Sequence, residues 1–130
     1  MRDRPLVLLL DDEEIFLEIA TIKLQMSGFG VEVAHTVSEA ITRVEELLPD
    51  LILSDIYMPP GPNGWEFALA VRSNPITKDI KFAFFTSLRD PMEELSQADR
   101  MRITKELKGV PVLSKTDDVD VLDKRVRGLL

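Results

Sequence analysis

Short apolar runs that end abruptly in polar residues constrain the fold of this chain more than any other feature. Each run is far too short to cross a membrane, and such runs are typical of strands buried on both faces of a parallel sheet. Segments with apolar residues at helical spacing separate the runs, so strands and helices are expected to alternate. The four runs are Leu6–Leu10, Leu51–Leu53, Phe82–Phe85 and Val110–Leu113.

A fifth strand is expected at Val31–Ala34, where apolar and polar residues alternate as in a half-exposed edge strand. The helices carry local signals of their own, including a capping box formed by Thr36 and Glu39 and an Asp90-Pro91 start. The five expected helices run from the acidic residues 11–14 to about Met26, from Thr36 to Leu48, from Trp65 to Arg72, from Asp90 to about Lys108, and over Val119–Leu129.

This alternation predicts one α/β domain over residues 1–130, built on a doubly wound five-stranded parallel sheet. Right-handed crossovers and the edge-like second strand favour the strand order 2-1-3-4-5. The expected architecture is therefore flavodoxin-like, with three layers in the order α/β/α. No output domain is visible after the last expected helix, and these residues do not decide whether the chain is a complete protein or part of a longer regulator or hybrid kinase.

Composition excludes several classes of function. A net charge of −7 without clustered Lys and Arg argues against a nucleic-acid surface. The chain has no cysteine, which excludes disulfides and thiolate chemistry. It shows neither a secretory leader nor an apolar run of membrane-spanning length. We therefore expect a cytoplasmic protein without a membrane partner.

Polar residues stand directly after the buried runs. Because ligands of open α/β sheets bind beyond the carboxyl ends of the strands, these residues are the candidates for a functional site. Clustered carboxylates repel one another, and a hard cation such as Mg²⁺ relieves that repulsion. A carboxylate can also act as a nucleophile toward a phosphoryl group. The candidates are Asp11, Asp12, Asp55, Thr86 and Lys115.

Five motifs in this order resemble the receiver domain of two-component response regulators, and the single-domain chemotaxis type is the most similar in size. Any one of the motifs alone is a weak signal, whereas the ordered set is highly specific and spans nearly the whole chain. The motifs are Leu-Leu-Leu-Asp11-Asp12-Glu13, Asp55-Ile-Tyr-Met58-Pro59 running to Gly64, Arg72-Ser-Asn-Pro75, Phe-Phe-Thr86-Ser87, and Lys115 after the last strand.

The resemblance implies a phosphoacceptor module of a phosphorelay rather than an enzyme with an external substrate. By it, Asp55 is the phosphoacceptor, and Mg²⁺ is held by Asp11, Asp12, Asp55 and the backbone carbonyl of Tyr57. The same resemblance assigns Thr86 and Lys115 to the phosphoryl oxygens. The implied partners are a sensor histidine kinase or a histidine phosphotransfer protein as donor, and a downstream effector protein. Direct binding to nucleic acid is not expected, and a homodimer stays open.

The sequence also departs from the family pattern. Val112 stands where the family commonly has an aromatic switch residue, and Thr116 follows Lys115 in place of a proline. The stretch between Thr86 and Lys115 is several residues longer than usual. We therefore expect intact phosphorylation chemistry with a readout that comes from the segment between Ser87 and Gly109.

Two other functions compete with that of a phosphoacceptor. A pseudo-receiver would keep the fold as a protein-binding module without using phosphorylation, and the complete set of site residues argues against it. A hydrolase of the aspartyl-phosphatase type would need an Asp-x-Asp motif after the first strand, which Asp11-Asp12-Glu13 does not supply.

The first expected helix carries two apolar stripes. Phe16, Ile19, Ala20 and Leu24 are expected to face the core. The second stripe, formed by Ile15, Ile22 and Met26, is either an interface or a set of scattered surface residues.

Overall fold

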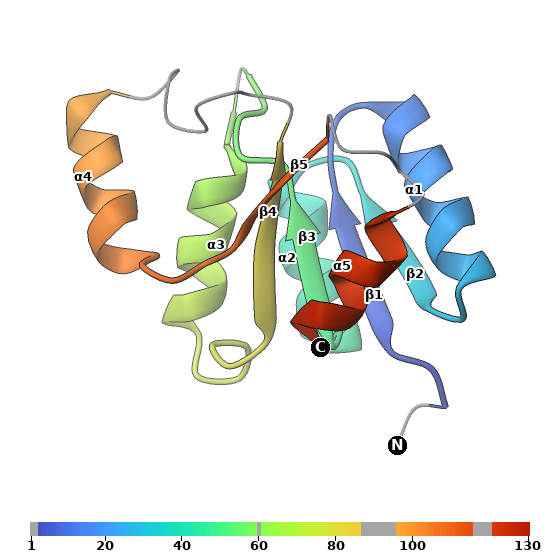
Figure 1. The fold of residues 1–130 in the computed structure, drawn as a ribbon. Helices are drawn as coiled ribbons and strands as arrows, with labels where there is room; N and C mark the ends of the chain where they lie inside the picture. The colour runs from blue at the N-terminus through green and yellow to red at the C-terminus, as the bar shows by residue number, and fades with distance from the viewer. Residues whose placement is uncertain (1–2, 60, 87–95, 116–120) are drawn as a thin grey trace.

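Five parallel strands form one sheet in the order β2-β1-β3-β4-β5 (Figure 1). The structure is a computed structural model that describes residues 3–59, 61–86, 96–115 and 121–130. This order confirms the prediction of a flavodoxin-like sheet. The strands are β1 Leu6–Leu10, β2 Gly30–Ala34, β3 Leu51–Ser54, β4 Lys81–Thr86 and β5 Val112–Ser114.

Helices alternate with the strands and cover both faces of the sheet, which gives three layers (Figure 1). Among the helices of the described ranges, none combines the length and the apolar character that a membrane span requires. The helices are α1 Glu14–Met26, α2 Val37–Leu47, α3 Gly64–Ser73, α4 Gln97–Glu106 and α5 Leu122–Leu129.

Alternate residues of each central strand point to opposite faces, so the sheet separates two apolar cores. On one face, Leu8, Ile52 and Phe82 pack with residues of α2, α3 and α4. On the other face, Val7 and Leu53 pack with residues of α1 and α5. Because both faces of β1 and β3 are covered, these strands read as continuous apolar runs in the sequence.

Local signals explain several helix ends. The hydroxyl of Thr36 accepts a hydrogen bond from the Glu39 amide at the start of α2, as the capping box predicts. A second capping box begins α3, where Asn63 and Glu66 satisfy each other's backbone amides. The fourth helix, as far as it is described, begins after Ser96, whose hydroxyl accepts from the Asp99 amide. The predicted Asp90-Pro91 helix start and the Lys115–Thr116 peptide bond lie outside the described residues.

The structure corrects two local predictions. The last strand begins at Val112 rather than Val110, in keeping with Pro111 having no amide hydrogen to donate to a ladder. Ile19 does not face the core but is 47% exposed, while Leu17 takes the core position beside Ala20. Two apolar stripes one residue apart both fit helical spacing, and only packing against the sheet selects between them.

Candidate functional site at the strand ends

Backbone hydrogen bonds continue one residue beyond the strands and hold the predicted site residues at one edge of the sheet. The Asp55 amide donates to the Leu10 carbonyl over 2.9 Å, and the Lys115 amide donates to the Thr86 carbonyl over 2.8 Å. The Asp11 amide donates to the Ala34 carbonyl of the edge strand over 3.2 Å. Each of these three residues is therefore hydrogen-bonded through its backbone to the neighbouring strand, just beyond the end of its own strand.

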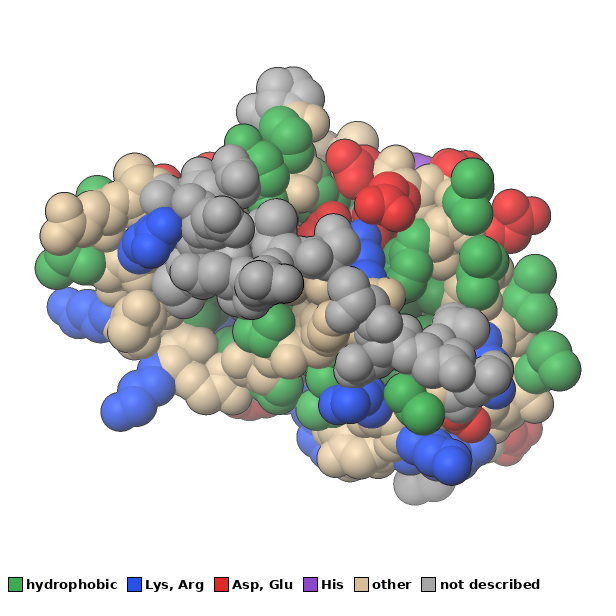
Figure 2. All heavy atoms as spheres, turned by 45° about the horizontal axis from the view of Figure 1, so that its top comes forward, with side chains coloured by type: hydrophobic (Ala, Val, Ile, Leu, Met, Phe, Trp, Pro, Cys, Tyr) green, Lys and Arg blue, Asp and Glu red, His purple; other side chains and the backbone are tan. Residues whose placement is uncertain are grey.

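Three carboxylates converge at this edge. One carboxylate oxygen from each of Asp11, Asp12 and Asp55 lies within 4.8 Å of the others. Asp11 and Asp55 are buried, whereas Asp12 is exposed. In Figure 2, which brings the top of Figure 1 forward, acidic side chains gather at the upper centre of the molecule. The cluster is therefore open to solvent on the side of Asp12.

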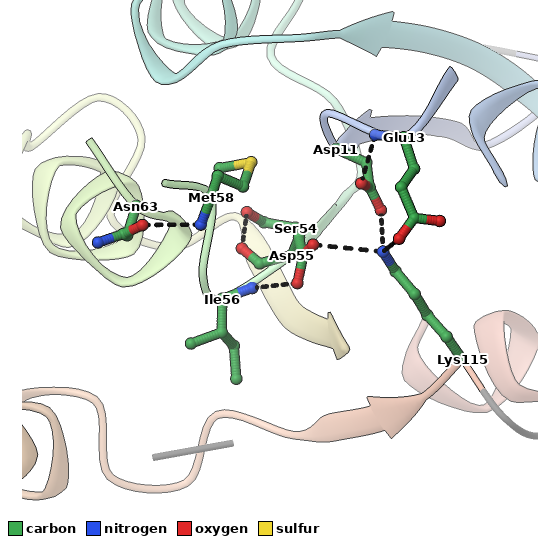
Figure 3. A network of polar contacts seen from close by, with 8 residues as sticks. All are labelled: Asp11, Glu13, Ser54, Asp55, Ile56, Met58, Asn63 and Lys115. Carbon is green, nitrogen blue, oxygen red and sulfur yellow. Dashed lines mark hydrogen bonds and ion pairs between the residues drawn. The ribbon is translucent and has the colours of Figure 1, made fainter. Parts of the chain in front are cut away.

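Lys115 reaches into the same cluster from the end of β5 (Figure 3). Its ammonium forms an ion pair with Asp11 and lies 3.3 Å from Oδ2 of Asp55. The side chain is only 6% exposed. A lysine is rarely buried to this degree unless it is paired with an acidic group, as Lys115 is here. The carboxylate of Glu13 lies 3.9 Å away and is largely exposed. Glu13 was not among the predicted site residues, and its position directly after the acidic pair is the sequence signal for its contact.

The loop after Asp55 is held by hydrogen bonds on both sides. Oδ1 of Asp55 accepts from the Ile56 amide over 2.8 Å, and the hydroxyl of Ser54 donates to the Asp55 carbonyl over 2.8 Å. Further along, Oδ1 of Asn63 accepts from the Met58 amide over 2.7 Å. Tyr57 lies between these anchored residues and is half-buried. Its carbonyl as a metal ligand stays a prediction.

Gly64 allows the start of α3 to approach Asp55 because it has no side chain. A Cβ atom at this position would lie 1.6 Å from the carbonyl oxygen of Asp55. The Gly64 amide also donates to the Ile56 carbonyl over 2.9 Å. The start of α3 therefore packs directly against the backbone of Asp55, and only glycine permits that approach.

Thr86 is buried at the end of β4, where it pairs with Ser114 of β5. Val112 lies opposite Phe84 on β5 and is 47% exposed. The structure thus brings Thr86 to the strand-end edge with the carboxylates and Lys115, and it leaves Val112 at the surface of the edge strand.

Burial sets the electrostatics of the cluster. It raises the pKa of Asp11 to about 6, against the opposing effect of its hydrogen bond with Lys115. Burial also raises the pKa of Asp55, again against Lys115. For Lys115 itself, burial lowers the pKa, but the hydrogen bond and charge of Asp11 outweigh it and hold the pKa above its ordinary value.

A hard divalent cation fits this donor set. The cluster of three carboxylates holds one ammonium, which contacts Asp11 and Asp55, so it keeps a net negative charge when all three are ionised. All three carboxylates offer oxygen ligands, which Mg²⁺ prefers, and the exposed Asp12 leaves a side open for water. Asp11, Asp12 and Asp55 are the residues that would hold the ion.

Comparison with known proteins gives matches to response regulators. A family model described as the response regulator receiver domain matches residues 7–127. Transcriptional regulatory protein TrcR of Mycobacterium tuberculosis is 31% identical over 125 residues, which are 95% of this chain and 44% of that protein. DNA-binding response regulator MtrA of Mycolicibacterium smegmatis is 40% identical over 74 residues, which are 57% of this chain and 31% of that protein. The chain therefore spans less than half the length of these curated relatives.

Solved structures with the same fold include regulators of similar length. Chemotaxis response regulator CheY4 of Vibrio cholerae has a TM-score of 0.80 at 26% identity, and the match covers 98% of this chain and 99% of that one. A CheY-like receiver domain protein from Methanospirillum hungatei has a TM-score of 0.76 at 22% identity, with 98% and 94% covered. At 22% identity, the second match shows similarity of fold alone.

Proposed function

The chain belongs to the response regulator receiver domain family, and on that premise we propose that it accepts a phosphoryl group on Asp55 from a phosphohistidine donor, with Mg²⁺ bound, and thereby changes its affinity for a partner. Receiver domains are signalling modules, and we expect no turnover of an external substrate. The proposal treats residues 1–130 as a single receiver domain.

The observation that carries the proposal is the cluster in which Asp55 lies together with Lys115 and two other carboxylates. An acyl phosphate forms when a carboxylate oxygen attacks phosphorus, as the P–N bond of the donor breaks and its imidazole leaves. Such a transfer needs positioning and charge neutralisation more than covalent help. The Lys115 ammonium lies 3.3 Å from Oδ2 of Asp55, so a cation stands beside the attacking oxygen and can neutralise the negative charge of the incoming phosphoryl oxygens.

Different residues of this chain have different roles in the proposed transfer. The Ile56 amide holds one oxygen of Asp55, so the side chain presents its other oxygen in a fixed direction. Lys115 lies near enough to Asp55 to contact the phosphoryl oxygens. Thr86, at the end of β4, can donate a hydrogen bond to them from its hydroxyl. Mg²⁺, held by Asp11, Asp12, Asp55 and the Tyr57 carbonyl, would neutralise the phosphoryl oxygens when bound.

The proposed partners are proteins. The donor is a sensor histidine kinase or a histidine phosphotransfer protein, and the recipient of the signal is a downstream effector, all in the cytoplasm. The curated relatives are named as DNA-binding or transcriptional regulators, but this chain aligns with less than half of each. We propose that residues 1–130 themselves do not bind nucleic acid, in keeping with their net charge of −7.

Intact-protein mass spectrometry after incubation with a small acyl phosphate and Mg²⁺ tests the proposal. The wild-type chain should gain the mass of one phosphoryl group, and Asp55→Asn should gain none while keeping its fold. Asp79→Asn, which changes an exposed aspartate in the same way, is the matched control and should behave as wild type. Failure of the wild type to gain phosphate would favour the pseudo-receiver, and phosphate that persists in Asp55→Asn would remove Asp55 as the acceptor.

A further inference from the structure

The Lys115 ammonium has an aromatic neighbour in addition to its carboxylates. The nitrogen lies 4.6 Å from the centroid of the Phe16 ring, and that ring stacks on Phe85 at a centroid distance of 5.0 Å and an interplanar angle of 27°. We propose that Phe16 is a positioning residue for the phosphoryl transfer, whose ring holds the Lys115 ammonium beside Asp55. This inference rests on the proposed function, since it assigns Lys115 to the transfer.

In the described part of the chain, four groups surround the ammonium, and one of them is the largely exposed carboxylate of Glu13 at 3.9 Å. Asp11 and Asp55 contact it with carboxylate oxygens, and the Phe16 ring lies close enough for a cation–π interaction, which operates within about 6 Å of the ring centroid. The lysine side chain is 6% exposed, so little water competes for the cation. Because a cation–π interaction is stronger when the cation is desolvated, the ring contributes more here than it would at the surface.

The position of Phe16 separates it from ordinary core residues of α1. Leu17, Ala20 and Leu24 are the buried residues that pack this helix against the sheet, whereas Phe16 is only partly buried. Phe16 also lines a small cavity together with Asp11 and Phe85. Its ring therefore lies between the apolar core and the acidic cluster.

Phe85 connects this ring to the other predicted phosphoryl contact. Phe85 directly precedes Thr86 on β4. It pairs with Leu113 of β5, which lies two residues before Lys115. The stack of Phe16 on Phe85 thus fixes the ring relative to the strand ends that carry both Thr86 and Lys115. A shift of the ring would change the position of the ammonium relative to the Thr86 hydroxyl.

An aromatic face suits a lysine that has to change partners. The face attracts a cation without taking up a hydrogen-bond donor and without fixing one direction of approach. The ammonium can therefore turn from the carboxylates toward a phosphoryl oxygen while it keeps contact with the ring. A carboxylate in the place of Phe16 would add charge repulsion to Asp55, and an aliphatic side chain would not attract the ammonium.

Stepwise fluorination of the ring separates this role from simple packing. Mono-, di- and trifluorophenylalanine at position 16 keep the shape of the side chain while they weaken the negative face of the ring. The rate constant for phosphorylation by a small acyl phosphate with Mg²⁺ should fall at each step, by about fivefold across the series. Phe16→Trp should retain the rate, and Phe16→Leu should lose at least as much as the trifluoro variant.

The same series at Phe67 is the matched control. Phe67 is fully buried in the core on the other face of the sheet and contacts Phe82, and among the residues that the structure describes no cation lies over its ring. Fluorination there should leave the rate constant unchanged. Equal rates along the Phe16 series, or an equal loss along the Phe67 series, would overturn the inference.

A second measurement does not depend on phosphorylation. The ring current of Phe16 should shift the ε-methylene protons of Lys115 upfield, both in wild type and in Asp55→Asn, and Phe16→Leu should remove the shift. If the wild type takes up no phosphate but shows the shift, the proposed function fails while the ring contact stands. If Phe16→Leu leaves the Lys115 resonances unchanged, the inference fails whatever the phosphorylation result.

Discussion

The ammonium of Lys115 lies 3.3 Å from Oδ2 of Asp55, although 60 positions separate the two residues in the chain. The Lys115 amide also donates to the Thr86 carbonyl, and the Asp55 amide donates to the Leu10 carbonyl. Both ends of this contact are therefore tied to the sheet. The same ammonium pairs with Asp11, so it occupies the carboxylates on which a metal ion would also depend.

Removal of this ammonium should affect stability and metal binding in opposite directions. Lys115→Met keeps the length of the side chain but leaves Asp11 and Asp55 without their buried cation, which should lower the free energy of unfolding at neutral pH by about 3 kcal/mol without metal. The stabilisation gained on adding Mg²⁺ should be larger than in wild type, because no ammonium competes for Asp11. Denaturant unfolding with and without Mg²⁺ measures both, and Lys78→Met at an exposed position is the control. A smaller gain from Mg²⁺ in Lys115→Met would contradict the competition.

Mg²⁺ should stabilise the wild-type chain through Asp12. A ligand that binds only the native state raises the free energy of unfolding, by about 2.7 kcal/mol at a concentration one hundred times its dissociation constant. Asp12→Ala should lose most of this gain, while Glu18→Ala, an exposed acid on α1 outside the cluster, should keep it. The measurement is thermal unfolding over a Mg²⁺ titration. Equal shifts in wild type and Asp12→Ala would exclude Asp12 as a ligand.

Without metal, the wild-type chain should lose stability as the pH rises through about 6. The pKa of Asp11 in the folded chain is about 6 because of burial, above its ordinary 3.8. The folded state therefore binds the proton more tightly, so the stabilisation is present below pH 3.8 and disappears as the pH passes the folded value. Asp55, whose pKa is also raised by burial, acts in the same direction.

The difference between wild type and Asp11→Asn isolates this effect from other titrating groups. Since one pKa unit corresponds to about 1.4 kcal/mol, the wild type should lose on the order of 3 kcal/mol relative to the variant between about pH 4 and pH 7. The measurement is urea unfolding in the presence of a metal chelator. A difference that stays constant over this range would show that Asp11 is not destabilised by burial.

Gly64→Ala should disturb the site through the backbone of Asp55. The new Cβ would lie 1.6 Å from the Asp55 carbonyl oxygen, so the start of α3 or the Asp55 backbone has to move. Overpacking of this kind costs about 1–3 kcal/mol and sometimes more, and we expect phosphorylation of Asp55 to slow as well. At Gly128, in α5, an added Cβ meets nothing within 4 Å, so Gly128→Ala is the control and should be neutral or stabilising. Two variants of equal stability and equal phosphorylation rate would refute the close approach as a constraint.

The sheet and the positions of the main site residues were predictable because they follow from periodicity and topology. Each buried strand is an apolar run, and parallel order brings the residues after the strands to one edge. Asp11, Asp55, Thr86 and Lys115 meet there for that reason. The contact between Phe16 and Lys115 was not predictable, because it depends on how far α1 is rotated about its axis.

That rotation also explains the error at Ile19. Both apolar stripes of α1 satisfy helical spacing, and the choice between them is made by the shape of the sheet surface. In the structure, Ile15, Ile22 and Met26 are exposed together with Ile19. Exposed apolar side chains are visible along the right flank of the molecule in Figure 2, on the side where Figure 1 shows α1.

Phosphorylation should change the protection of α4 from hydrogen exchange. Within its bounds this helix buries only Ile103, whereas α2 buries Val37, Ala40 and Val44. A helix with so little buried apolar surface can shift or loosen at a small cost in free energy. The surface-exposed, aliphatic Val112 gains little from moving between solvent and core, so we expect the added charge at Asp55 to act on α4 rather than on Val112.

Hydrogen exchange with and without an acyl-phosphate mimic measures this change. Amides of Gln97–Glu106 should change their exchange rates by about threefold or more, which corresponds to roughly 0.7 kcal/mol in local opening. Amides of Val37–Leu47 are the internal control and should stay constant. Changes confined to the loop from Asp55 to Gly64, with none in α4, would show that the signal does not leave the phosphorylation site by this route.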